Sequence, residues 1–88
     1  MPDRQQHNTL KEMKPGQSAI LERVLTESAS YRHSLYAMGL IPGVTIKVIR
    51  YAPLGDPIQI EVNQCQLTLR KQEADELLVS KINENHHD

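Results

Sequence analysis

The sequence predicts a mainly β protein, a small barrel of about five short strands with one α-helix inserted after the first strand. The chain has 88 residues, which is enough for one domain. Short runs of alternating apolar and polar residues recur along it, separated by turns that contain Pro and Gly. One stretch instead repeats its apolar residues at helical spacing. Strands this short, joined by tight turns, close most economically into a small barrel.

The N-terminal residues 1–8 are polar, and we expect them to be flexible. Leu10 and Met13 follow, and a short turn is expected to place both side chains on the core. A second turn comes next, in which Pro15 sets φ and Gly16 permits a positive φ. The chain is therefore expected to enter its first strand through two successive turns.

The first strand is predicted over residues 18–25, although its apolar residues do not alternate strictly. Ile20 and Val24 would share one face of this strand, whereas Leu21 and Leu25 would point the other way. We therefore expect a strand that is covered on both faces, by the barrel core and by a helix or a loop.

The helix is predicted from Ser28, whose hydroxyl group suits an N-cap, to Met38. Tyr31, Leu35 and Met38 are spaced i, i+4 and i+7, so they form one stripe along the helix. Gly39 follows, at the position where a helix end most often has glycine. The segment thus has a start signal, a periodic body and a stop signal.

The later segments alternate more clearly and complete the barrel. We predict strands over residues 44–50, 58–62 and 77–79, another strand marked by Leu67 and Leu69, and a single helical turn within residues 71–76. The barrel domain is expected to span residues 9–80, and the polar residues 81–88 are expected to form a flexible tail. Because the sequence contains no Phe and no Trp, the core must be aliphatic.

Composition narrows the class of function and the compartment. The formal net charge of -1 argues against a nucleic-acid-binding barrel, because binding to phosphates requires a surplus of Lys and Arg. The single Cys65 cannot form an internal disulfide, which suits a reducing compartment. No apolar run approaches the roughly 18 residues that span a bilayer, and residues 1–7 lack an apolar signal core. We therefore expect a cytoplasmic protein without direct membrane insertion.

No pattern of residues indicates catalysis. The sequence has no Ser-His-Asp arrangement and no glycine loop that would hold a phosphate group. His33 stands alone on a polar helix face, and His86 and His87 lie in the polar tail, where they would chelate a metal only weakly. We therefore expect no enzyme activity, no cofactor and no tight metal site.

Four segments in series match a known set of motifs. They are Leu10–Gln17 (L-x-x-M-x-P-G-Q), Leu35–Gly43 (L-x-x-M-G-L-x-P-G), Ala52–Ile58 (A-P-L-G-D-P-I) and Leu67–Ala74 (L-x-L-R-K-x-E-A). In order and spacing they resemble the signatures of the FeoA family, whose opening motif usually has Leu where this chain has Met13. The resemblance covers most of the chain between Leu10 and Val79.

The resemblance to the FeoA family implies an SH3-like barrel and a partner. The partner is FeoB, a membrane transporter of ferrous iron with a cytosolic GTP-binding domain. The chain would then be a non-catalytic accessory protein of bacterial ferrous iron uptake that binds and modulates FeoB through this GTPase domain. The alternative is a stand-alone SH3-like regulatory or peptide-binding domain, related to the C-terminal module of iron-dependent repressors. An exposed edge of an open barrel would also permit a homo-oligomer.

Two regions are candidates for binding the partner, and the first is the end of the helix. Tyr36 lies about 100° around the helix from Leu35 and is spaced i, i+4 from Leu40. Tyr36 and Leu40 would therefore form an exposed patch. The alternative is a structural role, in which Leu40 or Ile41 covers the end of the barrel.

The second candidate is the loop of residues 52–57. Its prolines stiffen it, so it would lose little entropy on binding. Leu54 near the tip is predicted to dock in an apolar groove of the partner, and Asp56 is predicted to cap the turn by accepting backbone N–H groups. The alternative is a rigid hairpin connection with Leu54 folded inward. The residues expected to shape the turns of the whole chain are Gly16, Gly39, Pro42, Gly43, Pro53, Gly55 and Pro57.

Overall fold

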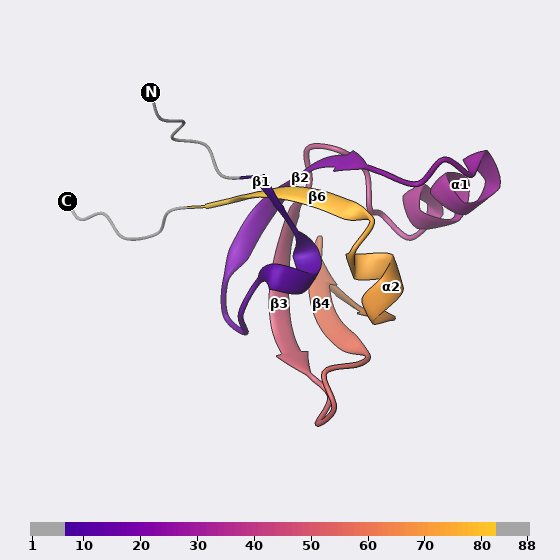
Figure 1. The fold of residues 1–88 in the computed structure, drawn as a ribbon. Helices are drawn as coiled ribbons and strands as arrows, with labels where there is room; N and C mark the ends of the chain where they lie inside the picture. Colours follow the sequence, from indigo (N-terminus) through magenta and orange to yellow (C-terminus); the bar gives the residue numbers. More distant parts are fainter. Residues whose placement is uncertain (1–6, 83–88) are drawn as a thin grey trace.

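Residues 7–82, which the computed structural model describes, form one six-stranded antiparallel sheet with a helix inserted after its second strand (Figure 1). The strands are β1 (His7–Thr9), β2 (Ser18–Val24), β3 (Thr45–Tyr51), β4 (Ile58–Val62), β5 (Cys65–Leu69) and β6 (Leu77–Lys81). The helical segments are the 3-10 turn η1 (Leu10–Glu12), the helix α1 (Ala29–Ala37) and the single turn α2 (Lys71–Ala74). The mainly β fold class and the inserted helix are confirmed, with six strands rather than about five.

The sheet curls around one core but does not close into a barrel. Its strand order is β1-β6-β2-β3-β4-β5, so β1 and β5 are its two edges. Neighbouring strands are antiparallel throughout the described residues. Each edge strand therefore keeps one side of its backbone without a strand partner in this sheet.

β1 is the strand that the sequence does not predict. Its residues, His7–Thr9, pair with β6. The sheet therefore extends beyond the predicted limits 9–80, and at the other end it includes Lys81. A strand this short carries no alternating pattern, so only its pairing with β6 identifies it. Residues 1–8 and 81–88 are predicted to be flexible termini. Of these, residues 1–6 and 83–88 lie outside the described residues.

The core is aliphatic, as the composition predicts. Every buried hydrophobic side chain among the described residues is Leu, Ile, Val, Met or Ala. β4 shows the pattern most clearly, because Ile58, Ile60 and Val62 all point inward. Leu10 and Ala74 cover the core from η1 and α2. Alternate residues of a strand share a face, so the inward side chains of β2 to β6 meet in one cluster.

A β-bulge explains the imperfect alternation of β2. The pairing of β2 with β6 shifts register between Leu21 and Arg23. Ala19 and Leu21 face the core before the shift, and Val24 faces it again afterwards. Ile20, on the opposite face, is exposed. The bulge adds one residue between inward positions, so the expectation of a strand covered on both faces is wrong.

α1, the longest of the described helices, begins as predicted. The Ser28 hydroxyl oxygen accepts a hydrogen bond from the backbone N–H of Tyr31 at 3.2 Å and so acts as the N-cap. The predicted stripe forms only in part, because Leu35 is buried and Tyr31 half-buried while Met38 is exposed. No helix among residues 7–82 has the length and apolar character that crossing a membrane requires.

The end of α1 turns the chain back onto the core. Gly39 has a φ of +97°, which glycine adopts without steric cost. The backbone N–H groups of Gly39 and Leu40 donate to the carbonyl oxygens of Tyr36 and Leu35, at 2.9 and 3.0 Å respectively. These two bonds define a Schellman motif. Leu35 and Leu40 are both fully buried in the core cluster, as the apolar contact of this motif requires.

Candidate functional site

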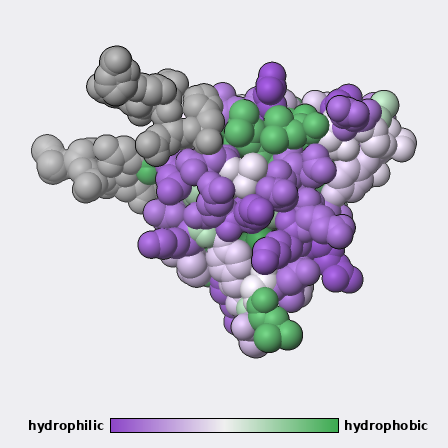
Figure 2. All heavy atoms as spheres, viewed as in Figure 1, coloured by the Kyte–Doolittle hydropathy of each residue, from purple (hydrophilic) through white to green (hydrophobic). Residues whose placement is uncertain are grey.

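The loop between β3 and β4, residues 52–57, projects from one end of the sheet and forms the lowest point of the molecule in Figure 1. The N–H of Ala52 donates to the carbonyl of Pro57 at 3.0 Å and closes the base of the loop, and the N–H of Gly55 donates to the carbonyl of Ala52 at 2.7 Å. Leu54 is 91% exposed. Figure 2 shows an apolar group of atoms at this tip. The loop therefore presents an apolar side chain to solvent on a closed turn.

Two side-chain hydrogen bonds fix the base of this loop. Asp56 Oδ1 accepts a bond from the backbone N–H of Lys71, the first residue of α2, at 2.9 Å. On the other side of the loop, the Tyr51 hydroxyl donates to the backbone carbonyl of Met13. Burial raises the pKa of the Tyr51 phenol above its ordinary value, which favours the protonated form that donates this bond. The base is held on both sides while the tip makes no contact with the core.

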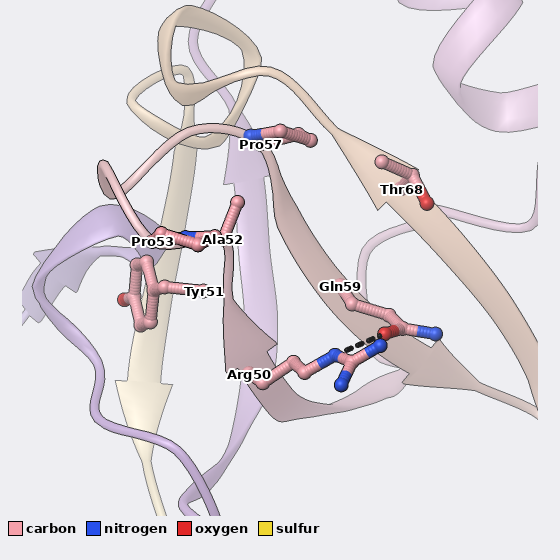
Figure 3. Close-up of a pocket in the computed structure, with 7 residues that line it drawn as sticks. All are labelled: Arg50, Tyr51, Ala52, Pro53, Pro57, Gln59 and Thr68. Carbon is pink, nitrogen blue, oxygen red and sulfur yellow. Dashed lines mark hydrogen bonds between the residues drawn. The ribbon is translucent and has the colours of Figure 1, made fainter.

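A groove of about 510 Å³ lies beside the loop (Figure 3). It is lined by Arg50, Tyr51, Ala52, Pro53, Pro57, Gln59 and Thr68. The loop supplies apolar surface through its alanine and its two prolines, and the strands β3, β4 and β5 supply the polar side chains. The groove therefore has one apolar and one polar side.

Two polar side chains that line the groove, those of Arg50 and Gln59, belong to a hydrogen-bonded row across three strands. Arg50 of β3 lies opposite Gln59 of β4 in register, and Arg50 Nε donates to Gln59 Oε1 at 3.0 Å. Gln59 Nε2 in turn donates to Oε1 of Gln66 on β5 at 2.8 Å. Within the described residues, these bonds leave the two terminal guanidinium nitrogens of Arg50 without a partner. The row therefore positions an available cationic group beside the loop.

The predictions for the loop have two different outcomes. Leu54 is exposed, so the alternative in which it folds inward is wrong. Asp56 does accept a backbone N–H, but the donor is Lys71, across the chain at the start of α2, rather than a residue of its own turn. Asp56 thus connects the loop to the end of β5 and is a structural residue in this conformation.

The predicted patch at the end of the helix does not form. Tyr36 is half-buried and packs against the core cluster. Leu40 is fully buried, because α1 ends at Ala37 and the turn at Gly39 directs the next residue inward. The i, i+4 spacing of Tyr36 and Leu40 would place them on one face only in a helix that continues to Leu40. Leu40 is therefore a core residue and offers no surface to a partner.

The glycines predicted for turns all have a positive φ, and they are Gly16, Gly39, Gly43 and Gly55. The prolines predicted for turns lie outside the strands and helices, and they are Pro42, Pro53 and Pro57.

Possible metal ligands do not come together in the structure. No three His, Cys, Asp or Glu side chains among residues 7–82 could hold one metal ion together. His33 and Cys65 are each exposed on the surface. His86 and His87 lie outside the described residues.

Arg50 and Gln59 are the residues of the site that sequence reasoning missed. A register shift between Val48 and Arg50 in the pairing of β3 with β4 places Arg50, rather than Ile49, opposite Gln59. The alternation of β4 does predict that Gln59 points outward. Two long polar side chains next to a proline-containing hairpin loop were the available signal, but the bulge conceals that they face each other.

Comparison with known proteins gives a family and a fold. The model of the FeoA domain matches residues 8–81 of this chain. The Fe(2+) transport protein A/Fe(2+) transporter FeoB fusion protein of Porphyromonas gingivalis is 32% identical over 76 residues, which are 86% of this chain and 9% of the fusion protein. The chain therefore spans less than a tenth of the length of this relative.

Solved structures share the fold over nearly all of this chain. The FeoA-like protein from Clostridium acetobutylicum is 30% identical with a TM-score of 0.81, over 93% of this chain and 94% of that protein. FeoA of Stenotrophomonas maltophilia, complexed with zinc and described as a procaryotic SH3 domain protein, is 27% identical with a TM-score of 0.71, over 81% and 87%. The predicted SH3-like fold is thus confirmed. A manganese-dependent transcriptional repressor with a TM-score of 0.80 is only 12% identical, over 93% of this chain and 43% of that protein, and shows the fold alone.

Proposed function

This chain belongs to the FeoA family, and we propose that it is a non-catalytic accessory protein of bacterial ferrous iron uptake that binds the membrane transporter FeoB. The exposed β3–β4 loop docks on the cytosolic GTPase domain of FeoB and modulates the transporter. The chain acts in the cytoplasm and reaches the inner face of the membrane through this partner.

The main support for this proposal is the fusion protein of P. gingivalis. By its name, one chain there joins Fe(2+) transport protein A to the transporter FeoB, and its similarity covers 86% of the present chain. Joining two modules in one chain raises the effective concentration of each for the other, which favours modules that bind one another. We infer the same association between the present chain and FeoB.

The surface of the loop supports this role. Leu54 is 91% exposed in the free protein. Burying such a side chain in a partner is favourable by about 1.5–3 kcal/mol relative to leaving it in water. The base of the loop is already fixed through Asp56 and Tyr51, so docking loses little further entropy. A rigid apolar tip of this kind suits an anchor residue in an interface.

Modulation of FeoB then follows from binding alone. A partner that binds one conformation of the GTPase domain more tightly than another shifts the population toward the first. GTP hydrolysis and transport change with that population. No reacting group of the accessory chain takes part in this mechanism.

Retention of FeoB by this chain tests the proposal. The tagged chain is incubated with solubilised membranes that contain full-length FeoB, with wild type, Leu54→Ala and Ile41→Ala side by side. Wild type should retain FeoB, and Leu54→Ala should weaken binding about 10-fold. Ile41 is 47% exposed in the α1–β3 connection, at the other end of β3 from the loop, so Ile41→Ala is the matched control. Absence of a complex with wild type at micromolar concentrations contradicts the proposal.

The alternative function is a stand-alone SH3-like regulatory or peptide-binding domain, related to the C-terminal module of iron-dependent repressors. It is supported by likeness of fold alone. Retention of a DNA-binding regulator from a soluble extract, with no retention of FeoB from membranes, would favour this alternative.

A further inference from the structure

We propose that the groove beside the β3–β4 loop binds an acidic segment of the partner, in which a carboxylate pairs with Arg50. This inference rests on the proposed function, because it names the chemistry of the FeoB segment that lies next to the docked Leu54. It assigns a specific contact to the polar side of the groove.

Arg50 is presented in the form that a carboxylate requires. Its side chain is exposed, and its Nε is engaged by Gln59 at 3.0 Å. The remaining donors are the terminal NH2 groups of a planar guanidinium, which bind the two oxygens of a carboxylate in parallel. The one ion pair among the described residues joins Lys11 to Asp75 at 3.4 Å, away from the groove. No acidic side chain within that part of the chain therefore forms an ion pair with Arg50.

Gln59 holds Arg50 in place and does not compete for the ligand. Its amide oxygen accepts from Arg50, and its amide nitrogen donates to Gln66 at 2.8 Å. Both ends of the amide group are thus engaged, which also defines its orientation. A guanidinium group that is already positioned loses less conformational entropy on binding than a free arginine side chain. Figure 3 shows the Arg50–Gln59 pair across the groove from Pro57.

The charge around the groove favours an acidic partner over a basic one. Arg70 and Lys71 are exposed at the end of β5 that pairs with the loop end of β4, so they add positive charge near Arg50. Asp56 is the acidic residue of the loop, and one of its oxygens accepts the N–H of Lys71. Acidic residues also lie at this end of the sheet, since Glu73 Oε1 accepts the N–H of Arg70 at 2.8 Å, but among the described residues that line the groove Arg50 is the one charged residue. Complementary charge therefore steers an acidic segment to the groove and fixes its register.

The loop and the groove together define the partner segment. Leu54 projects from the tip, while Pro53 and Pro57 form part of the apolar side of the groove. A segment that covers both would offer an apolar socket to the leucine and an Asp or Glu side chain to Arg50. The occupant that we propose is an acidic segment in the cytosolic part of FeoB, the transporter to which a relative of this chain is fused.

Titration calorimetry of the full chain against full-length FeoB in detergent tests this assignment, at two salt concentrations. Arg50→Gln should weaken binding about 10-fold, because it removes charge-assisted hydrogen bonds. Its affinity should also depend less steeply on salt than that of wild type. Arg50→Lys should recover only part of the loss, because an ammonium group lacks the paired donors. Arg23→Gln, which removes an exposed arginine of β2, is the matched control and should bind as wild type does.

The outcomes separate this inference from the proposed function. If Leu54→Ala weakens binding while Arg50→Gln matches wild type, the acidic segment is wrong and the accessory function stands. If Arg50→Gln binds FeoB more weakly but with the same salt dependence as wild type, the inference is also wrong. Arg50 would then contribute through the shape of its side chain rather than through its charge. If wild type does not bind FeoB, both proposals fail. If sedimentation shows that Arg50→Gln breaks a dimer without affecting FeoB binding, the occupant is a second copy and the inference is wrong.

Discussion

Leu40 and Leu54 stand in similar local sequences but in opposite environments. Each follows or precedes a glycine directly and has a proline within two residues. Leu40 is fully buried, whereas Leu54 is 91% exposed. Composition and hydropathy around the two residues do not distinguish them, so the cause must lie in how the backbone closes around each.

The closing hydrogen bonds explain the difference. The N–H of Leu40 donates back to the carbonyl of Leu35 at 3.0 Å, so the chain folds onto the helix it has just left and carries the side chain inward. The loop around Leu54 instead closes on itself, from Ala52 to Pro57, beyond the end of the sheet. A leucine beside Gly and Pro is therefore a core residue after a helix and an exposed anchor at a hairpin tip.

Replacing Leu40 should give the largest effect. Leu40→Ala leaves a cavity in the core and should lower the free energy of unfolding by about 3 kcal/mol. Ile41→Ala, at the next residue, which is 47% exposed, should lower it by less than about 1 kcal/mol. Urea denaturation of the two variants measures both values. Equal losses in the two variants would show that the turn does not direct Leu40 inward.

Gly39 supplies the backbone geometry behind this contrast and should give the next largest effect. A Cβ atom there would lie 4.0 Å from Val62 Cγ1, so there is space for it. The strain comes from the φ of +97°, and Gly39→Ala should cost about 1 kcal/mol. Gly39→Asn should cost less, because asparagine tolerates positive φ better. Thermal unfolding that ranks alanine above asparagine in stability would contradict this explanation.

Asp56 anchors the exposed loop and should give a smaller effect. Asp56→Ala removes the acceptor for the N–H of Lys71 and should cost about 0.5–1 kcal/mol. Asp56→Asn keeps an oxygen at that position and should retain most of the stability. Hydrogen exchange at the Lys71 amide should accelerate in the alanine variant and much less in the asparagine variant. Identical exchange in all three proteins would place the anchor of the loop elsewhere.

The sequence suffices for those elements whose signals are local. The strict alternation of Ile58–Val62 predicts β4 to the residue, and Ser28 with Gly39 predicts the limits of α1. β1 escapes prediction because three polar residues become a strand only by pairing with β6. The same reason applies to the bulge in β2, which is defined by its register with another strand.

The candidate site likewise has one part that local sequence predicts and one part that depends on the pairing of strands. Proline and glycine predict a stiff loop with Leu54 near its tip, because turn chemistry is local. The row of Arg50, Gln59 and Gln66 depends on the register of three strands and on the shift that precedes Arg50. For Leu40 the sequence leaves open an exposed patch or a place over the end of the barrel, and only the patch requires a helix that continues past Gly39. The structure has Leu40 buried. Long-range pairing and helix termination therefore account for what the sequence does not reveal.

Replacing Leu54 should give the smallest change in stability and a clear loss of binding. Because the side chain is exposed in the free protein, Leu54→Ala removes almost no buried surface and should change the free energy of unfolding by less than about 0.5 kcal/mol. Its binding to FeoB should still weaken about 10-fold, because the surface that it buries is formed only in the complex. Unfolding and FeoB binding are measured on the same preparation. A loss of stability as large as that of Leu40→Ala would mean that the loop folds inward in solution, and any loss of binding would then carry no information about an interface.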